Sequence, residues 1–183
     1  MRVSFVDEER GPAIRAEPER LDPSGFGMLY ETHRLAVYRY LRAKTANEED
    51  ALDLAADTFE RAFASLGRFR RRDGGVQAWL LRIARNTAID AHRRARRTTD
   101  IADADVQLGR MALEANRLEE RRPRIVDLLG GLPESQREPL LLRYAAGLTA
   151  REIGAVLGKR EGAIQKQIQR GIAALREASH DDA

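Results

Sequence analysis

The segment 147–176 constrains the fold of this chain more than any other part of its sequence. Thr149 and Glu152 have the spacing of a capping box, in which each side chain accepts a hydrogen bond from the backbone of the other, so we expect a helix to begin at Ala150. Gly158 is placed to end that helix in the left-handed conformation. A second helix is predicted after a short turn, because apolar residues recur at helical spacing: Ile164, Ile168, Ile172 and Leu175. This pattern is typical of a helix-turn-helix.

The N-terminal half of the second helix carries long polar side chains on its outer face. Such side chains can reach base edges in the major groove of DNA. The residues predicted to bind DNA here are Arg160, Glu161, Gln165, Lys166, Gln169 and Arg170. The alternative is a helical hairpin whose charged face only contacts water, since isolated matches to this motif are common.

Three longer helices are predicted upstream from apolar residues at helical spacing. The first has one stripe made of Phe26, Leu29, Tyr30, His33, Val37, Tyr40 and Leu41. The second begins at Asn47, with Asp50 as its capping partner, and buries Leu52, Ala55, Phe59, Ala62, Phe63 and Leu66. The third runs from Val76 into a basic run at 93–97, with Trp79 and Ile83 on its buried side. Three helices of this kind form a small bundle.

The chain is therefore expected to be all-α, with two small helical domains joined by a linker. We expect a flexible leader over 1–24, a three-helix domain over 25–97, an acidic linker over 98–121 and a helix-turn-helix domain over 122–179. The composition agrees, because hydrophobic residues make up 43% of the chain and aromatic residues only 5%, which favours helices over a β-sandwich.

The sequence argues against an enzyme, a disulfide-linked protein and a membrane protein. The chain has no cysteine, which excludes disulfides and a thiol nucleophile. Its histidines, His33, His92 and His180, lack the spacing of metal ligands, and no Gly-rich phosphate loop precedes a helix. No apolar run reaches the roughly 20 residues that a membrane span needs. We therefore expect a cytoplasmic protein with no catalytic residue, no cofactor and no metal.

The third helix and the loop before it carry a basic surface that includes one aromatic residue. The surface consists of Arg68, Phe69, Arg70, Arg82, Arg85, Asn86, Arg93 and Arg94. A solvated face would mix both signs of charge, but acids are scarce among these residues. Such a surface suits a phosphate backbone together with an unstacked base, so we expect it to bind nucleic acid.

The second helix carries the opposite charge on its polar face. Asp50, Asp53, Asp57 and Glu60 recur at three- and four-residue steps, away from Phe59. Like charges in a row slightly destabilise a helix, and they would repel DNA. The row either keeps the protein in solution or docks a basic partner, and both alternatives are open at this point.

Taken in order, these segments resemble a known family. The runs FGMLYETHRLAVYRYL, DALDLAADTFERAFASLGRFRRRDGGVQAWLLRIARNTAIDAHRRARR and LPESQREPLLLRYAAGLTAREIGAVLGKREGAIQKQIQRGIAAL are similar to those of bacterial RNA polymerase sigma factors of the extracytoplasmic-function type. The resemblance covers about residues 26–97 and 122–176. It is specific because two separate motifs occur in the expected order.

The resemblance implies a role for each surface. The acidic row, with Asp53 and Asp57 foremost, would dock on the clamp helices of core RNA polymerase. Phe69 and Asn86 would hold a base flipped from the minus-ten element of the promoter. The backbone of that element would be gripped by Arg82, Arg85, Arg93 and Arg94. The helix-turn-helix would read the minus-thirty-five element.

The partners implied are core RNA polymerase and promoter DNA, and the resemblance leaves an anti-sigma factor open as a third. The alternative function is a helix-turn-helix regulator that binds operator DNA without polymerase. That alternative explains the C-terminal half equally well, but it gives the acidic row and the basic loop around Phe69 no role.

Several residues depart from the pattern of the family, including Gln165, Lys166 and Gln167, which stand where Lys-Ser-Arg is frequent. Arg160 stands at the predicted N-cap of the recognition helix, where Ser is usual, and Ala56 stands in the docking helix where Gln is common. Pro139 replaces an apolar residue, and it must either kink its helix or lie in a first turn opened by Ser135.

Overall fold

The computed structural model describes residues 22–70, 74–98 and 129–181. These ranges contain helices and turns and no strand, which confirms the all-α prediction. None of the helices described there is both long enough and apolar enough to span a bilayer. The predicted leader up to residue 21 and the predicted linker from residue 99 onward lie outside the described residues.

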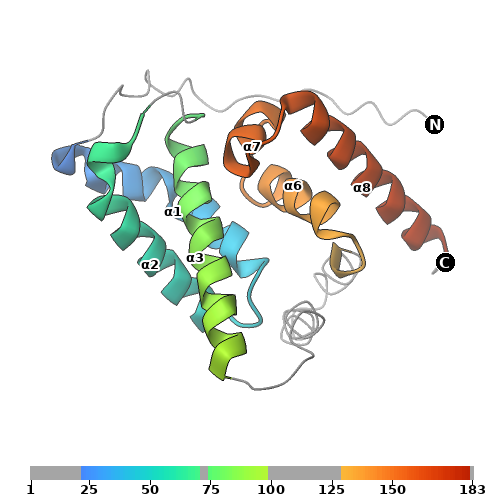
Figure 1. Ribbon diagram of the computed structural model, residues 1–183, viewed down its shortest axis with the longest axis horizontal. Helices are drawn as coiled ribbons and strands as arrows, with labels where there is room; N and C mark the ends of the chain where they lie inside the picture. Colours follow the sequence, from blue (N-terminus) through green and yellow to red (C-terminus); the bar gives the residue numbers. More distant parts are fainter. Residues whose placement is uncertain (1–21, 71–73, 99–128, 182–183) are drawn as a thin grey trace.

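The helices form two bundles that lie beside each other (Figure 1). The N-terminal bundle consists of α1 (Phe26–Arg42), α2 (Glu48–Ala64) and α3 (Val76–Thr98). The C-terminal bundle contains α6 (Glu134–Tyr144), α7 (Ala150–Leu157) and α8 (Glu161–Asp181). Short 3-10 turns precede α1 and follow α2, at η1 (Pro23–Gly25) and η2 (Leu66–Arg68).

Helix α1 buries most of its predicted apolar stripe. The buried residues are Leu29, His33, Val37, Tyr40 and Leu41, whereas Tyr30 stays exposed. Burial lowers the pKa of His33, so its imidazole stays neutral in the core. The turn η1 is capped by the side chain of Asp22, which accepts a hydrogen bond from the Gly25 N–H at 3.1 Å. Residues 22–24 were predicted as leader, so the folded part of the chain begins slightly earlier than expected.

Helix α2 begins where the sequence predicts, because the Asn47 side chain accepts a hydrogen bond from the Asp50 N–H at 2.7 Å. Its buried face is narrower than predicted, since Leu52 and Phe63 are 53% and 51% exposed. The reason is geometric: α1 and α3 cover an arc of α2 that centres on Ala62, and the two exposed residues lie at the edge of that arc.

Helix α3 contacts α1, α2 and α7, and the residues of its N-terminal half are buried or half-buried, with one exception. Trp79 belongs to this core, as the sequence predicts. The Trp79 ring packs edge-on against Phe69, with 5.4 Å between the ring centroids. Because aromatic rings bury a large apolar area, this contact holds the loop before α3 against the bundle.

The helix-turn-helix forms from α7 and α8 as predicted. The Thr149 hydroxyl accepts a hydrogen bond from the Glu152 N–H at 3.3 Å, and the Glu152 carboxylate accepts one from the Thr149 N–H at 2.7 Å. Gly158 ends α7 with a φ of 66°, which a residue with a side chain rarely adopts. Ile164 at the start of α8 is fully buried, and the rest of its stripe is half-buried.

Helix α6 begins at Glu134 with Pro133 at its N-cap, so the prediction of a first turn opened by Ser135 is wrong. Pro139 lies in the interior of the helix and is buried. Because proline has no N–H, the carbonyl of Ser135 lacks its usual intrahelical donor at this point.

The two bundles pack together, mainly through α3 and α7. The Gln77 amide on α3 donates to the Ala146 carbonyl at 2.5 Å. Gly74, with a φ of 88°, approaches α7 so closely that a Cβ placed on it would lie 2.6 Å from the Ala155 Cβ. Buried residues of both bundles form one contiguous apolar cluster. The two domains therefore share a core in this structure.

We expect Gly154→Ala to destabilise the C-terminal bundle by about 1–3 kcal/mol, as overpacking usually does. A Cβ at Gly154 would lie 2.5 Å from the carbonyl oxygen of Lys159, which is part of the turn between α7 and α8. Urea unfolding followed by circular dichroism measures the loss. Gly162→Ala is the matched control, because a Cβ there has nothing within 4 Å and Ala favours a helix. Equal stability of the two variants would contradict this explanation.

Candidate nucleic-acid interface

The recognition helix presents its predicted DNA-reading residues to solvent. Arg160, which precedes α8, and the five residues on α8 are all exposed: Glu161, Gln165, Lys166, Gln169 and Arg170. Burial of Ile164 sets the rotation of the helix and turns Gln165 and Lys166 outward. The Gln165 amide lies 3.5 Å from the Glu161 carboxylate, a weak contact that leaves the amide available to a base edge.

A second polar surface lies on α3 around one asparagine. Among residues 76–92, only Asn86 is exposed. Arg82 and Arg93 share its face, about one turn before and two turns after it, and Arg94 is exposed next to Arg93. This arrangement brings together an amide that can bind a base edge and guanidinium groups that can bind phosphates.

Phe69 does not belong to this exposed surface, and its burial argues against the predicted contact with a flipped base. Its side chain is 0% exposed and packs against Trp79, so a flipped base could reach it only if the ring left the core. Arg68 and Arg70 beside it are exposed. The Arg70 guanidinium donates to the carbonyls of Gly67 and Phe69, which helps to hold the loop. Phe69 therefore positions this basic loop.

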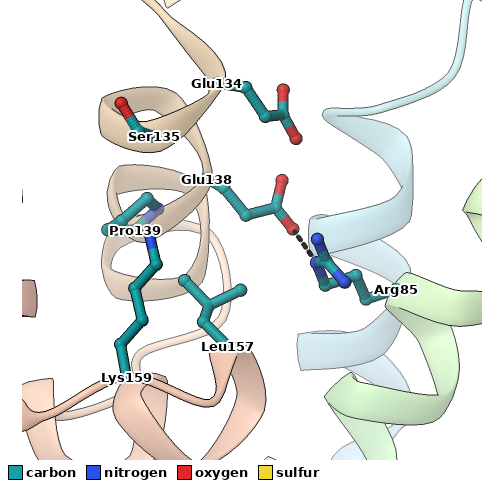
Figure 2. A pocket seen from close by; sticks show the side chains of 7 residues that line it. All are labelled: Arg85, Glu134, Ser135, Glu138, Pro139, Leu157 and Lys159. Carbon is teal, nitrogen blue, oxygen red and sulfur yellow. Dashed lines mark ion pairs between the residues drawn. The ribbon is translucent and has the colours of Figure 1, made fainter.

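Arg85 contacts the C-terminal bundle. Its Nε lies 3.5 Å from the carboxylate of Glu138 on α6. Figure 2 shows the two side chains facing each other. A small cavity of about 90 Å³ lies at this junction of the bundles, with Pro139 and Leu157 among its lining residues. In this arrangement the Arg85 guanidinium lies against a carboxylate of the other bundle.

Asp90 lies at the edge of the basic surface and ties α3 to α2. The Arg61 guanidinium donates to its carboxylate at 2.9 Å. This hydrogen bond, together with the charges of Arg61, Arg93 and Arg94, holds the pKa of Asp90 below its ordinary value. Asp90 therefore stays ionised at neutral pH and keeps its contact with α2.

The acidic row on α2 contains residues with two different roles. Asp53 and Glu60 are exposed and Asp57 is half-buried. Asp50 accepts a hydrogen bond from the Asn47 amide at 3.0 Å and lies in the first turn, where a carboxylate favours the helix dipole. Asp50 is thus part of the helix cap, and the other three carboxylates are available to a partner.

Large apolar side chains lie exposed beside these carboxylates, although the sequence pattern predicts them to be buried. We call the combined surface the α2 docking face, and it consists of Leu52, Asp53, Ala56, Asp57, Glu60 and Phe63. Next to it lies a shallow hollow of about 400 Å³, lined by Phe26, Tyr30, Ala56, Phe59, Glu60 and Phe63. Exposed apolar residues among charges are typical of a surface that binds another protein.

Comparison with known proteins agrees with this layout. Residues 29–98 match the family model of Sigma-70 region 2, and residues 122–175 match that of Sigma-70 region 4. The first range contains the α2 docking face and the surface around Asn86, and the second contains the helix-turn-helix.

Individual sigma factors are similar over most of the chain. The ECF RNA polymerase sigma factor SigD of Mycobacterium tuberculosis is 32% identical, over 96% of this chain and 91% of that protein. The ECF RNA polymerase sigma factor BldN of Streptomyces coelicolor is 31% identical over 88% of this chain, which spans only 63% of BldN. Among solved structures, CnrH in complex with the cytosolic domain of CnrY is 28% identical, with a TM-score of 0.65 over 88% of this chain and 92% of that one.

These similarities cover both bundles in the same order along the chain. They favour a sigma factor over a helix-turn-helix regulator that works without polymerase. The chain belongs to the ECF family of RNA polymerase sigma factors.

Proposed function

We propose that this chain binds core RNA polymerase in the cytoplasm and directs it to promoters, where it opens the minus-ten element and reads the minus-thirty-five element. The chain catalyses no reaction of its own. The observation that carries this proposal is the combination of an acidic and apolar face on α2 with two separate polar surfaces on α3 and α8. A regulator that only binds operator DNA has no use for the first of these.

The α2 docking face suits a basic protein partner. Its carboxylates at Asp53, Asp57 and Glu60 would steer the encounter, while burial of Leu52 and Phe63 would supply affinity. Two half-exposed large apolar side chains would not raise the solubility of the protein, so a purely solubilising face does not account for them. The same face would repel DNA, so the polymerase is its proposed partner.

The surface around Asn86 suits an open DNA strand. Flipping a base out of a duplex costs a few kcal/mol, and an amide that bonds the flipped base offsets part of that cost. Arg82 and Arg93 would hold the phosphates on either side. With Phe69 buried, Asn86 is the residue on this helix that we propose to contact the base.

An anti-sigma factor is the proposed third partner. The similar protein CnrH is solved in complex with the cytosolic domain of CnrY. In this chain the hollow beside the α2 docking face exposes aromatic side chains that a second protein could bury. A protein that covers this face would compete with core polymerase.

We expect the double variant Asp53→Lys, Asp57→Lys to bind core polymerase at least about tenfold more weakly, because both charges reverse on a face that meets a basic partner. Both residues lie outside the buried face of α2, so the fold should persist. Circular dichroism and a quantitative pull-down measure the two properties. The charge-matched control is Glu31→Lys with Glu177→Lys, two exposed acids on α1 and α8. Undiminished binding by the folded test variant would remove the docking proposal.

We expect Asn86→Ala and Phe69→Ala to fail in different ways. Asn86 is exposed, so its loss should slow promoter opening while leaving the stability of the protein nearly unchanged. Phe69 is buried, so its loss should lower the free energy of unfolding by about 3–5 kcal/mol. Permanganate footprinting of promoter thymines reports opening, and urea unfolding reports stability. An Asn86→Ala variant that opens promoters at the wild-type rate would contradict the role proposed for this amide.

We expect the neighbours Gln165 and Lys166 to act differently. Gln165 can pair with an adenine edge, a contact worth roughly 1–3 kcal/mol, so Gln165→Ala should relax preference at one promoter position. Lys166 is expected to meet phosphate, so Lys166→Ala should weaken all sequences equally and lower the salt slope by about one unit. Binding titrations on single-base variants at several salt concentrations distinguish the two effects. If Lys166→Ala changes sequence preference instead, the helix docks with a different rotation.

A further inference from the structure

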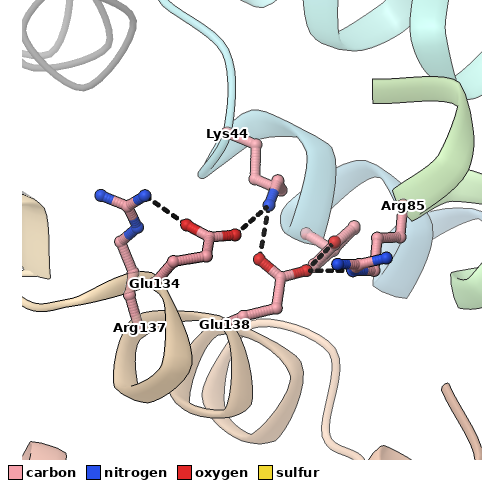
Figure 3. A network of polar contacts seen from close by, with 6 residues as sticks. Lys44, Arg85, Glu134, Arg137 and Glu138 are labelled. Carbon is pink, nitrogen blue, oxygen red and sulfur yellow. Dashed lines mark hydrogen bonds and ion pairs between the residues drawn. The ribbon is translucent and has the colours of Figure 1, made fainter. Parts of the chain in front are cut away.

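A buried carboxylate of the C-terminal bundle is bound by side chains of the N-terminal bundle. Glu138 lies on α6 of the C-terminal bundle, yet its side chain is only 3% exposed and is held by residues of the N-terminal bundle. Its carboxylate accepts a hydrogen bond from the Tyr40 hydroxyl, lies 2.5 Å from the Lys44 ammonium and 3.5 Å from the Arg85 Nε. Figure 3 shows Lys44 and Arg85 converging on Glu138.

The groups around Glu138 have the chemistry of an anion site. A buried charge is tolerated only when it is paired and hydrogen-bonded, and here two cations and a hydroxyl supply the pairing. Burial and then the charge of Glu138 raise the pKa of Tyr40, so its hydroxyl keeps the proton that it donates. Glu134 contacts Lys44 from the rim, at 3.9 Å, with its side chain 55% exposed.

The Glu138 carboxylate does not satisfy every hydrogen-bond donor of this site. The Arg85 Nε is buried and, among the residues that the structure describes, has no hydrogen-bond acceptor in suitable geometry. Its ion pair with Glu138 is the longer of the two that bind this carboxylate. A larger, tetrahedral anion, such as a phosphate diester, could place an oxygen atom to accept a hydrogen bond from this group as well.

We propose that Tyr40, Lys44 and Arg85 form a binding site for a phosphate of the nucleic-acid backbone, and that Glu138 occupies this site when the two bundles are closed. Arg85 directly precedes Asn86, so a phosphate bound here would adjoin the surface proposed to contact an open strand. Glu138 and a phosphate carry the same charge and need the same cations, so they exclude each other. DNA binding at this site therefore requires the bundles to separate. The proposal that DNA binds at this site rests on the proposed function. The proposal that Glu138 holds the two bundles together does not.

The variant Glu138→Gln tests directly whether Glu138 holds the two bundles together. It keeps the shape of the side chain but removes the buried carboxylate between Lys44 and Arg85, so that only the exposed Glu134 remains near Lys44; this loss should separate the bundles. The chain has no cysteine, so Leu35→Cys and Ala173→Cys, two exposed positions on α1 and α8, allow two dyes to be attached to the full chain. We expect Glu138→Gln to lower the energy transfer between the dyes, with neither DNA nor polymerase present.

The same variants test the anion site with a short single-stranded oligonucleotide. We expect Glu138→Gln to bind it about fivefold to tenfold more tightly than the wild type, with a salt slope steeper by about 0.7 for each phosphate gained. The matched control is Glu134→Gln on the same helix, which also removes a carboxylate from Lys44 but at the exposed rim. It should change neither energy transfer nor affinity appreciably.

Lys44→Gln distinguishes the closed arrangement of the bundles from the phosphate site. It leaves Glu138 with Arg85 as its only cation, so the bundles should open, but the anion site has then lost a charge and DNA affinity should not rise. Circular dichroism shows whether each variant is folded. If Glu138→Gln does not fold, Lys44→Gln still tests whether loss of this ion pair separates the bundles. Unchanged energy transfer in the folded Glu138→Gln chain would overturn the closure. Opening without a gain in oligonucleotide affinity or salt slope would overturn the phosphate site, while the binding of polymerase through the α2 docking face would stand.

Discussion

The packing of α3 against both bundles is the interaction on which the rest of the structure depends. Its N-terminal half is surrounded by α1, α2 and α7, so most of its side chains serve the core. This burial leaves one exposed position before the helix emerges, which is Asn86. The same burial places Arg85 against the C-terminal bundle. A single helix therefore sets both the position of the proposed DNA contact and the contact between the domains.

The surfaces that we propose for different partners differ in charge. The α2 docking face is acidic and apolar, whereas the surface around Asn86 and the recognition helix are polar and basic. Charge would repel DNA at the first surface and attract it at the others, so a chain of small net charge could still separate its proposed partners. The formal net charge of +3 hides this separation, which appears only when the residues are placed on helices.

Local signals in the sequence predicted the fold well, and long-range contacts account for what was missed. The capping box of Thr149 and Glu152 and the left-handed Gly158 need only neighbours in the chain, and both are confirmed. Phe69 lies in a run of arginines that suggests a surface, but its burial depends on Trp79 across the loop. Glu138 was not singled out at all, because its partners lie on the other bundle. Leu52 and Phe63 fit an apolar stripe that the neighbouring helices do not fully cover.

Run-off transcription with core polymerase tests the central claim most directly. Core enzyme alone and core enzyme with this chain are compared on the same genomic fragments, and the DNA binding of the chain alone is measured in parallel. We expect discrete transcripts only when the chain is present, with the chain retained on the polymerase. Specific DNA binding with no association with the polymerase and no discrete transcript would contradict it.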